Sequence, residues 1–538
     1  MASRKSEQVK NPSSNAGRLS AALDGVRREF VATGAFSFFI NILMLVSPLF
    51  MLQVYDRVLT SRSGMTLLML AILAVALLAV MGLLDTIRSR LLVRTAKRID
   101  TLTNDTLFNG VFKAAVYKPE VNGGQYFRDM DAVRQFMTGG PVLAFFDAPW
   151  APVYILIIFL MHPLLGLVAA VGAAIIFALG WLNEATTRVP LKAASEEFFL
   201  ANDMVDRSLR NAEVLRAMGM REGIRKLWRI HQNAALDAQC LASDRAGGIA
   251  AASKAVRLVL QVLILAAGAM LAIDQVITPG VMIAASIIMG RALAPFEQAI
   301  GGWRGFVQAR DAYARLEKIL GVAAGETKGM SLPAPTGRVE VEKILAAPPG
   351  ATAPVIRGLS FTLEPGACLG VVGPSAAGKT TLARLLLGIW PVRSGHVRLD
   401  GADVFAWDHE ELGPHVGYLP QDVELFSGSV ADNIARFGDV NPDRVVAAAH
   451  ATGIHDMILS LPGGYDSPIG TGGVNLSAGQ RQRVGLARAL YGDPVFVILD
   501  EPNANLDTDG EAALARAIRG LKARGATTVV ITHRRPIL

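Results

Sequence analysis

The chain has few cysteines and few charged residues. Its 538 residues include only two cysteines, Cys240 and Cys368, which lie too far apart to suggest a disulfide framework or a metal site. We expect both to be small apolar residues that fill space in a reducing compartment. Charged residues make up 18% of the chain and hydrophobic residues 51%, whereas soluble proteins carry about 25% charged residues. This excess of apolar residues indicates a membrane protein.

The chain also lacks the features of a nucleic-acid-binding protein and of a secretory precursor. Its net charge is +7, but the basic residues form no patch interleaved with aromatic residues, so we expect no nucleic-acid partner. Basic residues gathered in the cytoplasmic loops of a membrane protein explain this charge. Residues 1–28 are polar and basic and have no apolar core followed by a cleavage site. We therefore expect residues 1–31 to form a cytoplasmic tail, not a signal peptide.

Six apolar stretches predict an all-α transmembrane domain over residues 32–320. Each stretch approaches the roughly 20 residues that a helix needs to cross the hydrocarbon core. The stretches run near residues 32–55, 64–84, 142–161, 163–183, 254–273 and 276–295. Proline interrupts the first stretch at Pro48 and the third at Pro149 and Pro152, and neighbouring helices can accommodate such breaks.

The loops between these stretches alternate in length, which orients the spans. The loops near 56–63, 162 and 274–275 are short, whereas the loops at 85–141 and 184–253 are long and rich in Lys and Arg. The positive-inside rule places both long loops and both termini in the cytoplasm.

The long loops have helical patterns, so we expect them to continue the membrane helices into the cytoplasm. Their tips, near 119–130 and 200–213, would contact the soluble domain and couple it to the membrane; an ordinary solvated helix face is the alternative. Asp147 and Arg291 are ionisable residues near the cytoplasmic ends of their spans. A charge at membrane depth is costly, so these two residues either anchor helices at the interface or line a pathway.

The remainder of the chain predicts a linker and a soluble α/β domain. Residues 321–337 are rich in Gly, Pro and Ala and lack apolar periodicity, which is typical of a linker. From residue 338 to 538, short apolar strands alternate with helices. Residues Gly373 to Thr380 read G-P-S-A-A-G-K-T between an apolar run and a helical pattern. This strand–loop–helix context and the spacing fit the phosphate loop G-x-x-x-x-G-K-[ST], which predicts ATP binding.

The phosphate loop suggests roles for particular side chains. Lys379 would reach the β- and γ-phosphates, and the Thr380 hydroxyl would hold Mg²⁺. The apolar run 495–499 predicts a buried parallel strand that ends in Asp500 and Glu501. Carboxylates at this end of a parallel strand face the ligand crevice. Asp500 would bind Mg²⁺, and Glu501 would polarise the water that attacks the γ-phosphate.

Further segments complete a series of motifs. Leu476–Gln480 begins a helix whose free N–H groups can seat an anion, Gln421 lies on a loop, and His533 follows a second apolar strand. In this order the motifs resemble those of the ATP-binding cassette family. They correspond to its Walker A loop (Gly373–Thr381), Q-loop (Gln421), signature sequence (Leu476–Gln480), Walker B strand (Val495–Glu501), D-loop (Asn505–Asp507) and switch histidine (His533).

The resemblance implies a homodimer that hydrolyses ATP with Mg²⁺ at two sites on its interface. By resemblance, ATP would be bound by Gly373, Ser375, Ala376, Ala377, Gly378, Lys379, Thr380 and Thr381 of one subunit and by Ser477, Gly479 and Gln480 of the other. The implied catalytic residues are Glu501, His533 and Gln421, and the implied metal ligands are Thr380, Asp500 and Gln421.

The membrane half extends the resemblance to exporters of type I secretion systems. The stretches that carry it are 38–41, 48–59, 147–153 and 290–295, and they are most similar to exporters of proteases, lipases and surface-layer proteins. This group implies a bacterial inner-membrane protein that moves an unfolded polypeptide with a C-terminal signal. It also implies a periplasmic adaptor and an outer-membrane channel as partners. Export of lipid or small molecules, and a catalytically silent ATP-binding scaffold of a secretion complex, remain alternatives.

The chain departs from the family pattern in four places. One is Thr471, which stands where exporters often carry a glutamate that contacts the cytoplasmic loops. Ala346–Pro349 stands where the family carries an aromatic residue that stacks on adenine, and Ala478 replaces the first glycine of the signature sequence. The sequence stops at Leu538, soon after His533, so we expect a cassette that is short at its C-terminal end.

Overall fold

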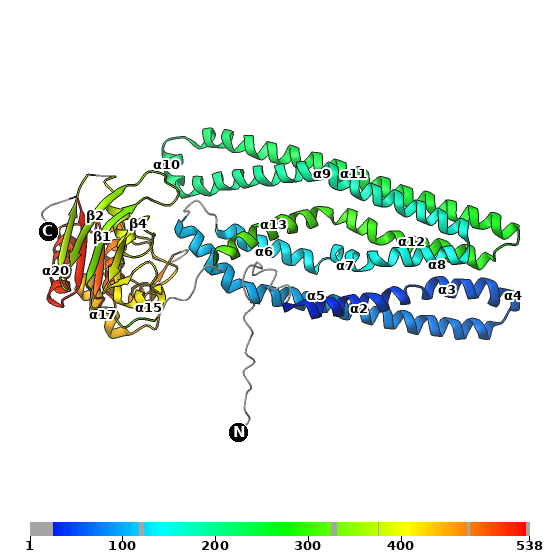
Figure 1. The fold of residues 1–538 in the computed structure, drawn as a ribbon, viewed down its shortest axis with the longest axis horizontal. Helices are drawn as coiled ribbons and strands as arrows, with labels where there is room; N and C mark the ends of the chain where they lie inside the picture. Colours follow the sequence, from blue (N-terminus) through cyan, green and yellow to red (C-terminus); the bar gives the residue numbers. More distant parts are fainter. Residues whose placement is uncertain (1–24, 118–122, 324–330, 375, 471–473, 534–538) are drawn as a thin grey trace, which may run out of the picture. The chain divides into compact units, whose positions relative to one another are not determined.

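The computed structural model describes residues 25–117, 123–323, 331–374, 376–470 and 474–533. The chain forms two compact units (Figure 1). The described part of the helical unit comprises residues 25–113 and 123–323. The described part of the α/β unit comprises residues 114–117 and the segments from residue 331 onward.

The helical unit consists of long helices joined by short turns. Its elements are α2 (Arg27–Leu43), α3 (Val46–Gln53), the π-helical turn η1 (Val54–Val58), α4 (Leu59–Ser61), α5 (Gly64–Tyr117), α6 (Gly123–Thr138), α7 (Gly140–Asp147), the 3-10 turn η2 (Ala148–Trp150), α8 (Ala151–Met161), α9 (Pro163–Arg210), α10 (Ala212–Ala217), α11 (Arg221–Ile273), α12 (Pro279–Gly301) and α13 (Trp303–Ala323). The described residues contain six helical segments long and apolar enough to span a membrane. The six predicted spans are therefore confirmed.

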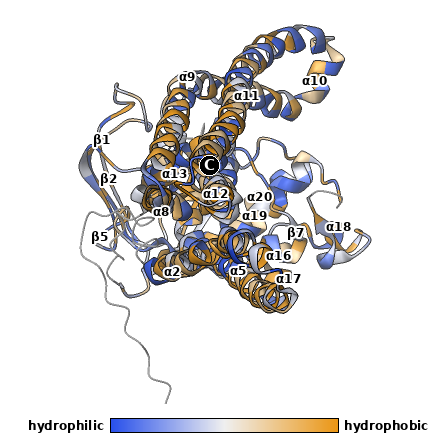
Figure 2. Ribbon diagram, turned by 90° about the vertical axis from the view of Figure 1, so that its right-hand side faces the viewer, coloured by the Kyte–Doolittle hydropathy of each residue, from blue (hydrophilic) through white to orange (hydrophobic). Residues whose placement is uncertain are grey.

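These spanning segments are largely uncovered by protein. In the most apolar window of the segment Gly64–Tyr117, only 6% of the residues are buried inside the unit. Many hydrophobic residues of the long helices are exposed, for example Leu68, Ile72 and Val75 of α5, and hydrophobic positions recur along the ribbons of these helices in Figure 2. In a bilayer, lipid tails would cover this surface.

The first and third spans are interrupted close to proline residues, whereas α12 continues through Pro295. The first span is interrupted at Met44 and Leu45, between α2 and α3. Met44 lies four residues before Pro48. In a regular helix the N–H of residue 48 would donate to the Met44 carbonyl, but proline has no N–H and its ring would clash with that carbonyl. The third span narrows to the 3-10 turn η2 around Pro149.

The long loops are helical, as the sequence predicts, because α5, α9 and α11 continue far beyond their apolar stretches. The predicted position of the second tip, 200–213, is wrong. α9 remains helical to Arg210, and the turn lies at 211–220 around the short helix α10. Of the first predicted tip, 119–130, residues 119–122 lie outside the described residues, and 123–130 belong to α6.

Close packing of small residues against large ones holds the helical unit together. α9 and α11 pair along much of their length, and an added Cβ at Gly172 would lie 2.5 Å from Leu260. Glycine therefore allows the two helices to approach closely. Leu260 belongs to a hydrophobic core that also contains the buried side chains of Ile176, Ile264 and Leu293.

A largely buried polar cluster joins α2, α5, α7 and α8. One Asp147 oxygen accepts hydrogen bonds from Asn41 Nδ2 at 2.8 Å and from Arg88 Nη1 at 3.0 Å. The same Arg88 nitrogen donates to Ser37 Oγ at 2.9 Å, and Tyr154 donates to the Asn41 side-chain oxygen at 2.9 Å. Arg88 is only 4% exposed. Asp147 is thus paired within the protein, whereas Arg291 is exposed.

Removing the cation from this cluster should destabilise the helical unit. Arg88→Met leaves the Asp147 carboxylate, which is only 13% exposed, without its charged partner. Removing one member of a fully buried pair typically costs about 3–5 kcal/mol. We expect a clear fall in the thermal unfolding temperature of the detergent-solubilised protein. Arg90→Met, at an exposed position two residues along α5, is the control. Equal stability of the two variants would show that the ion pair contributes nothing.

The described residues of the α/β unit form two four-stranded sheets and one two-stranded sheet. The antiparallel sheet has the order β2-β1-β4-β5, and the parallel sheet has the order β3-β10-β9-β6. The strands are β1 (Val339–Ala346), β2 (Ile356–Leu363), β3 (Cys368–Val372), β4 (Ser394–Leu399), β5 (Ala402–Asp403), β6 (Val416–Leu419), β7 (Gly428–Ser429), β8 (Pro468–Ile469), β9 (Phe496–Asp500) and β10 (Thr527–Thr532). β7 pairs with β8 in the small sheet.

Helices connect and cover these sheets. They are α14 (Lys379–Leu386), α15 (His409–Leu412), the turn η3 (Gly413–His415), α16 (Val430–Ile434), α17 (Pro442–Ala451), α18 (His455–Leu459), the turn η4 (Gly464–Asp466), α19 (Ala478–Leu490) and α20 (Thr508–Ala523). The parallel strand β9 is buried along its whole length. Its alternate residues belong to different cores: Phe496 and Ile498 pack with α14, and Val497 and Leu499 pack with α19 and α20. The continuous apolar run therefore forms the buried strand that was predicted.

The segment that enters the α/β unit is held by one carboxylate. α13 ends at Ala323 and β1 begins at Val339. Asp400, in the turn after β4, accepts hydrogen bonds from the backbone N–H groups of Gly337 at 3.2 Å and Arg338 at 3.0 Å. Burial alone would raise the pKa of Asp400, but these bonds and those from Thr336 together lower it. The charged carboxylate thus fixes the start of β1.

The expectation that both cysteines fill apolar space is wrong. Cys240 and Cys368 are both exposed free thiols. Cys368 is the first residue of β3, an outer strand of the parallel sheet, and so has neighbouring backbone on one side only. Cys240 lies on a solvent-facing turn of the long helix α11.

Candidate functional site

The phosphate loop connects β3 to α14 through a strained turn. Ala376 has φ 65° and Gly378 has φ 88°, a left-handed conformation that favours glycine. An added Cβ at Gly378 would also lie 2.7 Å from Val355, so both the backbone angle and the available space call for glycine there. α14 begins directly afterwards at Lys379, which points the free N–H groups of its first turn into the loop. Ser375 lies outside the described residues.

The Lys379 ammonium group is held inside this loop. Its Nζ donates to the carbonyl oxygens of Gly373 and Pro374, at 2.9 Å each, and lies 3.2 Å from His533 Nε2. The residue is only 9% exposed. The cation therefore sits where the phosphate oxygens of a nucleotide could take the place of the two carbonyl groups as its partners.

Asp500 is a buried carboxylate whose negative charge would be stabilised by a bound cation. It is 1% exposed, and neither of its oxygens has a hydrogen-bond partner of normal geometry among the described residues. Burial raises the pKa of Asp500; Thr380 opposes this rise, and the neighbouring Glu501 charge adds to it. A divalent cation held between Asp500 and Thr380 would satisfy both oxygens, so these residues fit Mg²⁺.

Glu501 is the centre of the site. Its Oε2 accepts a hydrogen bond from Gln421 Nε2 at 3.0 Å, and its Oε1 lies 2.6 Å from His533 Nε2. Its backbone N–H donates to Ile531 O at 2.9 Å, and its φ of 48° is unusual for a residue with a side chain. The fold thus brings together Gln421, Glu501, His533 and Lys379 from four separate segments, as the motif order predicts.

The signature segment forms a well-capped helix start. Ser477 is the N-cap of α19 and exchanges reciprocal hydrogen bonds with Gln480, at 3.2 and 2.8 Å. Ala478 is the first helical residue, and an added Cβ at Gly479 would lie 2.6 Å from Asn505 O. Among the described residues, Ser477, Gly479 and Gln480 form no hydrogen bond with the phosphate loop. This fits their predicted role at the nucleotide of another subunit.

One buried residue near the site was not singled out from the sequence. Gln482 of α19 is 2% exposed and bonds to the backbone of the segment that follows β9. A signal was available, because Gln482 shares the buried face of α19 with Gly485, Leu486 and Ala489. A polar residue at such a position implies a buried hydrogen-bonding partner.

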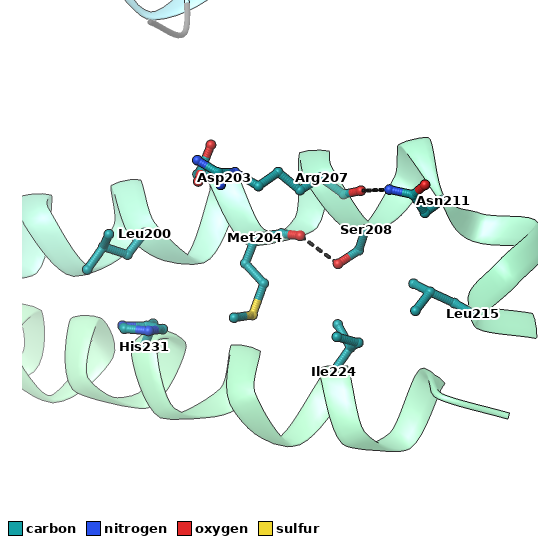
Figure 3. A pocket seen from close by; sticks show the side chains of 9 residues that line it. All are labelled: Leu200, Asp203, Met204, Arg207, Ser208, Asn211, Leu215, Ile224 and His231. Atoms are coloured by element: carbon teal, nitrogen blue, oxygen red, sulfur yellow. Dashed lines mark hydrogen bonds and ion pairs between the residues drawn. The ribbon is translucent and has the colours of Figure 1, made fainter. Parts of the chain in front are cut away.

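The tip of the α9–α11 hairpin carries an open apolar groove. It has a volume of about 870 Å³ and is lined by residues of α9, α10 and α11, including Arg216, Arg221 and Arg225. An adjoining pocket is shown in Figure 3, where Met204 of α9 and Ile224 of α11 point into the gap between the helices. Apolar walls beside several arginines are typical of a surface that meets a protein partner.

Comparison with known proteins agrees with this architecture. The ABC transporter transmembrane region matches residues 30–294, and the ABC transporter domain matches residues 356–504. The type I secretion system ATP-binding protein PrsD of Rhizobium meliloti (strain 1021) is 47% identical over 96% of this chain and 89% of its own length. This chain belongs to the type I secretion ABC transporters. The cyclolysin secretion/processing ATP-binding protein CyaB of Bordetella pertussis (strain Tohama I / ATCC BAA-589 / NCTC 13251) is 30% identical, over 93% of this chain and 71% of CyaB.

A solved structure gives the same fold. A bacterial Atm1-family ABC exporter with ATP bound superimposes with a TM-score of 0.80, covering 95% of this chain and 91% of that exporter, at 22% identity. The predicted fold class is confirmed, as are the resemblance and the ATPase activity of a membrane transporter that binds ATP. The roles of the individual site residues stay predictions.

Proposed function

We propose that this protein hydrolyses ATP to export an unfolded polypeptide with a C-terminal signal through a type I secretion channel. Its membership of the type I secretion transporters supports polypeptide cargo. The observation that best supports ATP hydrolysis is the contact of Glu501 with both Gln421 and His533, beside the phosphate loop that holds Lys379. These residues form a site for phosphoryl transfer to water.

In the proposed reaction, the phosphate loop and Lys379 bind the β- and γ-phosphates and Glu501 accepts a proton from the attacking water. Gln421 and His533 hold the Glu501 carboxylate by its two oxygens, which orients it as a general base. Thr380, Asp500 and Gln421 would hold Mg²⁺, which neutralises charge on the phosphates when bound. The unpartnered Asp500 oxygens support this metal assignment.

The proposed assembly is a homodimer in the inner membrane of a bacterium, with both termini in the cytoplasm. Among the described residues, Ser477 bonds within its own helix start and makes no hydrogen bond to the phosphate loop, which supports two ATP sites shared between subunits. The basic long loops support the orientation. A periplasmic adaptor and an outer-membrane channel are its proposed partners. The short turns at 62–63, 162 and 274–278 would lie on the periplasmic side in this orientation, where these partners are proposed to bind.

Coupling through the loop tips stays a prediction. Residues 114–117, at the end of α5, cluster with the α/β unit, where Trp390 Nε1 donates to Val116 O at 3.4 Å. The open apolar groove at the tip of the α9–α11 hairpin, which is flanked by arginines, is a further surface that we propose contacts a cassette of the dimer. Both features support transmission of cassette movement to the membrane helices.

Reconstitution tests the proposed function. Purified protein in vesicles with Mg²⁺ and ATP should release phosphate, and a cell carrying the cognate adaptor and channel should secrete a reporter fused to a C-terminal secretion signal. Secretion should stop when the chain is absent. Phosphate release with no effect on secretion would favour lipid or small-molecule export. Secretion that survives the loss of all phosphate release would favour a silent scaffold.

A further inference from the structure

The segment that carries Glu501 is tied to the signature helix by one buried amide. Gln482 Nε2 donates to Glu501 O at 3.1 Å and to Pro502 O at 2.7 Å. Gln482 Oε1 accepts the Asn505 N–H at 3.1 Å. Both N–H donors of this side chain, which is 2% exposed, and its oxygen are therefore bonded to residues 501–505.

The same face of α19 makes a second close contact with this segment. Gly479 lies three residues before Gln482, and positions three apart share a helix face. An added Cβ at Gly479 would lie 2.6 Å from Asn505 O. The start of α19 and the residues after β9 therefore pack as one body, with the amide of Gln482 as its polar connection.

The backbone of Glu501 needs such support. Its φ of 48° is a left-handed conformation that residues with side chains seldom adopt and that persists only where neighbours hold it. Its N–H donates to Ile531 O, and its carbonyl accepts hydrogen bonds from the Ala504 N–H at 3.1 Å and from Gln482 Nε2. Of these three bonds, the one from Gln482 ties the backbone of Glu501 to α19, and the carboxylate of the same residue contacts Gln421 and His533.

We infer that Gln482 is a positioning residue for ATP hydrolysis, which holds the backbone of Glu501 and links it to the helix that begins at Ser477. The inference rests on the proposed role of Glu501. It has a mechanical consequence: because Ser477 and Gly479 are proposed to bind the nucleotide of the partner subunit, a shift of α19 on binding would reach Glu501 of the same chain.

The test compares two buried amides. Gln482→Met keeps the length of the side chain and removes its three hydrogen bonds. Asn433→Leu is the matched control, since Asn433 is also fully buried and makes three hydrogen bonds to backbone, all with Phe426 and Ser429 and none with residues 501–505. For Gln482→Met we expect kcat to fall at least tenfold while KM and the affinity for a fluorescent ATP analogue stay within threefold. Asn433→Leu should lose comparable thermal stability and keep kcat within threefold.

Hydrogen exchange decides the question independently of activity. In Gln482→Met, amides in peptides that cover 501–505 should exchange at least tenfold faster than in wild type, and Asn433→Leu should leave them unchanged. Unchanged exchange, or a kcat that falls no further than in the control, would overturn the inference.

If wild type released no phosphate, the proposed function would fail while exchange still tested the Gln482 contact. Should Gln482→Met fail to fold, Gln482→Asn, which keeps the amide but is too short to make the same bonds, takes its place with the same expected results.

Discussion

Replacing Glu501 with glutamine should nearly abolish ATP turnover while leaving ATP binding intact. Glutamine has the same shape and can still hydrogen-bond to Gln421 and His533, so the site stays assembled. It cannot accept the proton of the attacking water. Loss of a positioned general base typically costs about 10²–10⁴-fold in rate. We therefore expect phosphate release at about 1% of the wild-type rate or below.

Phosphate release and binding of a fluorescent ATP analogue measure the two halves of this prediction. Glu410→Gln, which removes one carboxylate from an exposed position of α15, is the control for the change in charge. Wild-type turnover in Glu501→Gln would remove Glu501 from its proposed role. A loss of nucleotide binding in this variant would instead show that the carboxylate is needed to assemble the site.

Replacing Lys379 with alanine should weaken nucleotide binding itself. The ammonium group is buried and donates only within the loop and toward His533. A hydrogen bond from a charged donor contributes about 1.5–3 kcal/mol, which corresponds to a loss of affinity of about 10- to 150-fold. Turnover at saturating ATP should fall as well, because the γ-phosphate loses the cation that positions it.

Nucleotide titration monitored by fluorescence or calorimetry checks this expectation. Lys522→Ala, at an exposed position of α20, removes a lysine from the same unit and should bind as wild type does. Thermal unfolding without nucleotide separates a binding defect from a folding defect. An unchanged dissociation constant for Lys379→Ala would contradict the assignment of the phosphate loop.

The sequence predicted that Gln421, Glu501 and His533 come together, but it did not predict the hydrogen bonds between them. The order of motifs places Gln421, Glu501 and His533 at one edge of a parallel sheet, because each follows a strand of that sheet. The sequence could not show that Gln421 and His533 each contact a different oxygen of Glu501. Such distances depend on how strands far apart in the chain come into register.

Buried polar partners show the same limit in the helical unit. Asp147 was recognisable as a costly charge near the membrane, but the sequence placed Arg88 in a cytoplasmic loop. The structure pairs them at 3.0 Å, since α5 continues as one helix and presents Arg88 to α7. Helix periodicity extends such helices correctly, yet it does not identify which residues of different helices meet.

The sequence alone determined the six membrane spans, their extension as helices and the position of the phosphate loop. These features depend on local patterns: the length of apolar runs, helical periodicity and the conformational demands of glycine and proline. Only the tertiary structure decided that Arg88 neutralises Asp147 and that Gln482 holds the strained backbone of Glu501. The physical reason is that a buried polar group needs a partner, and that partner is supplied by packing between segments distant in the chain.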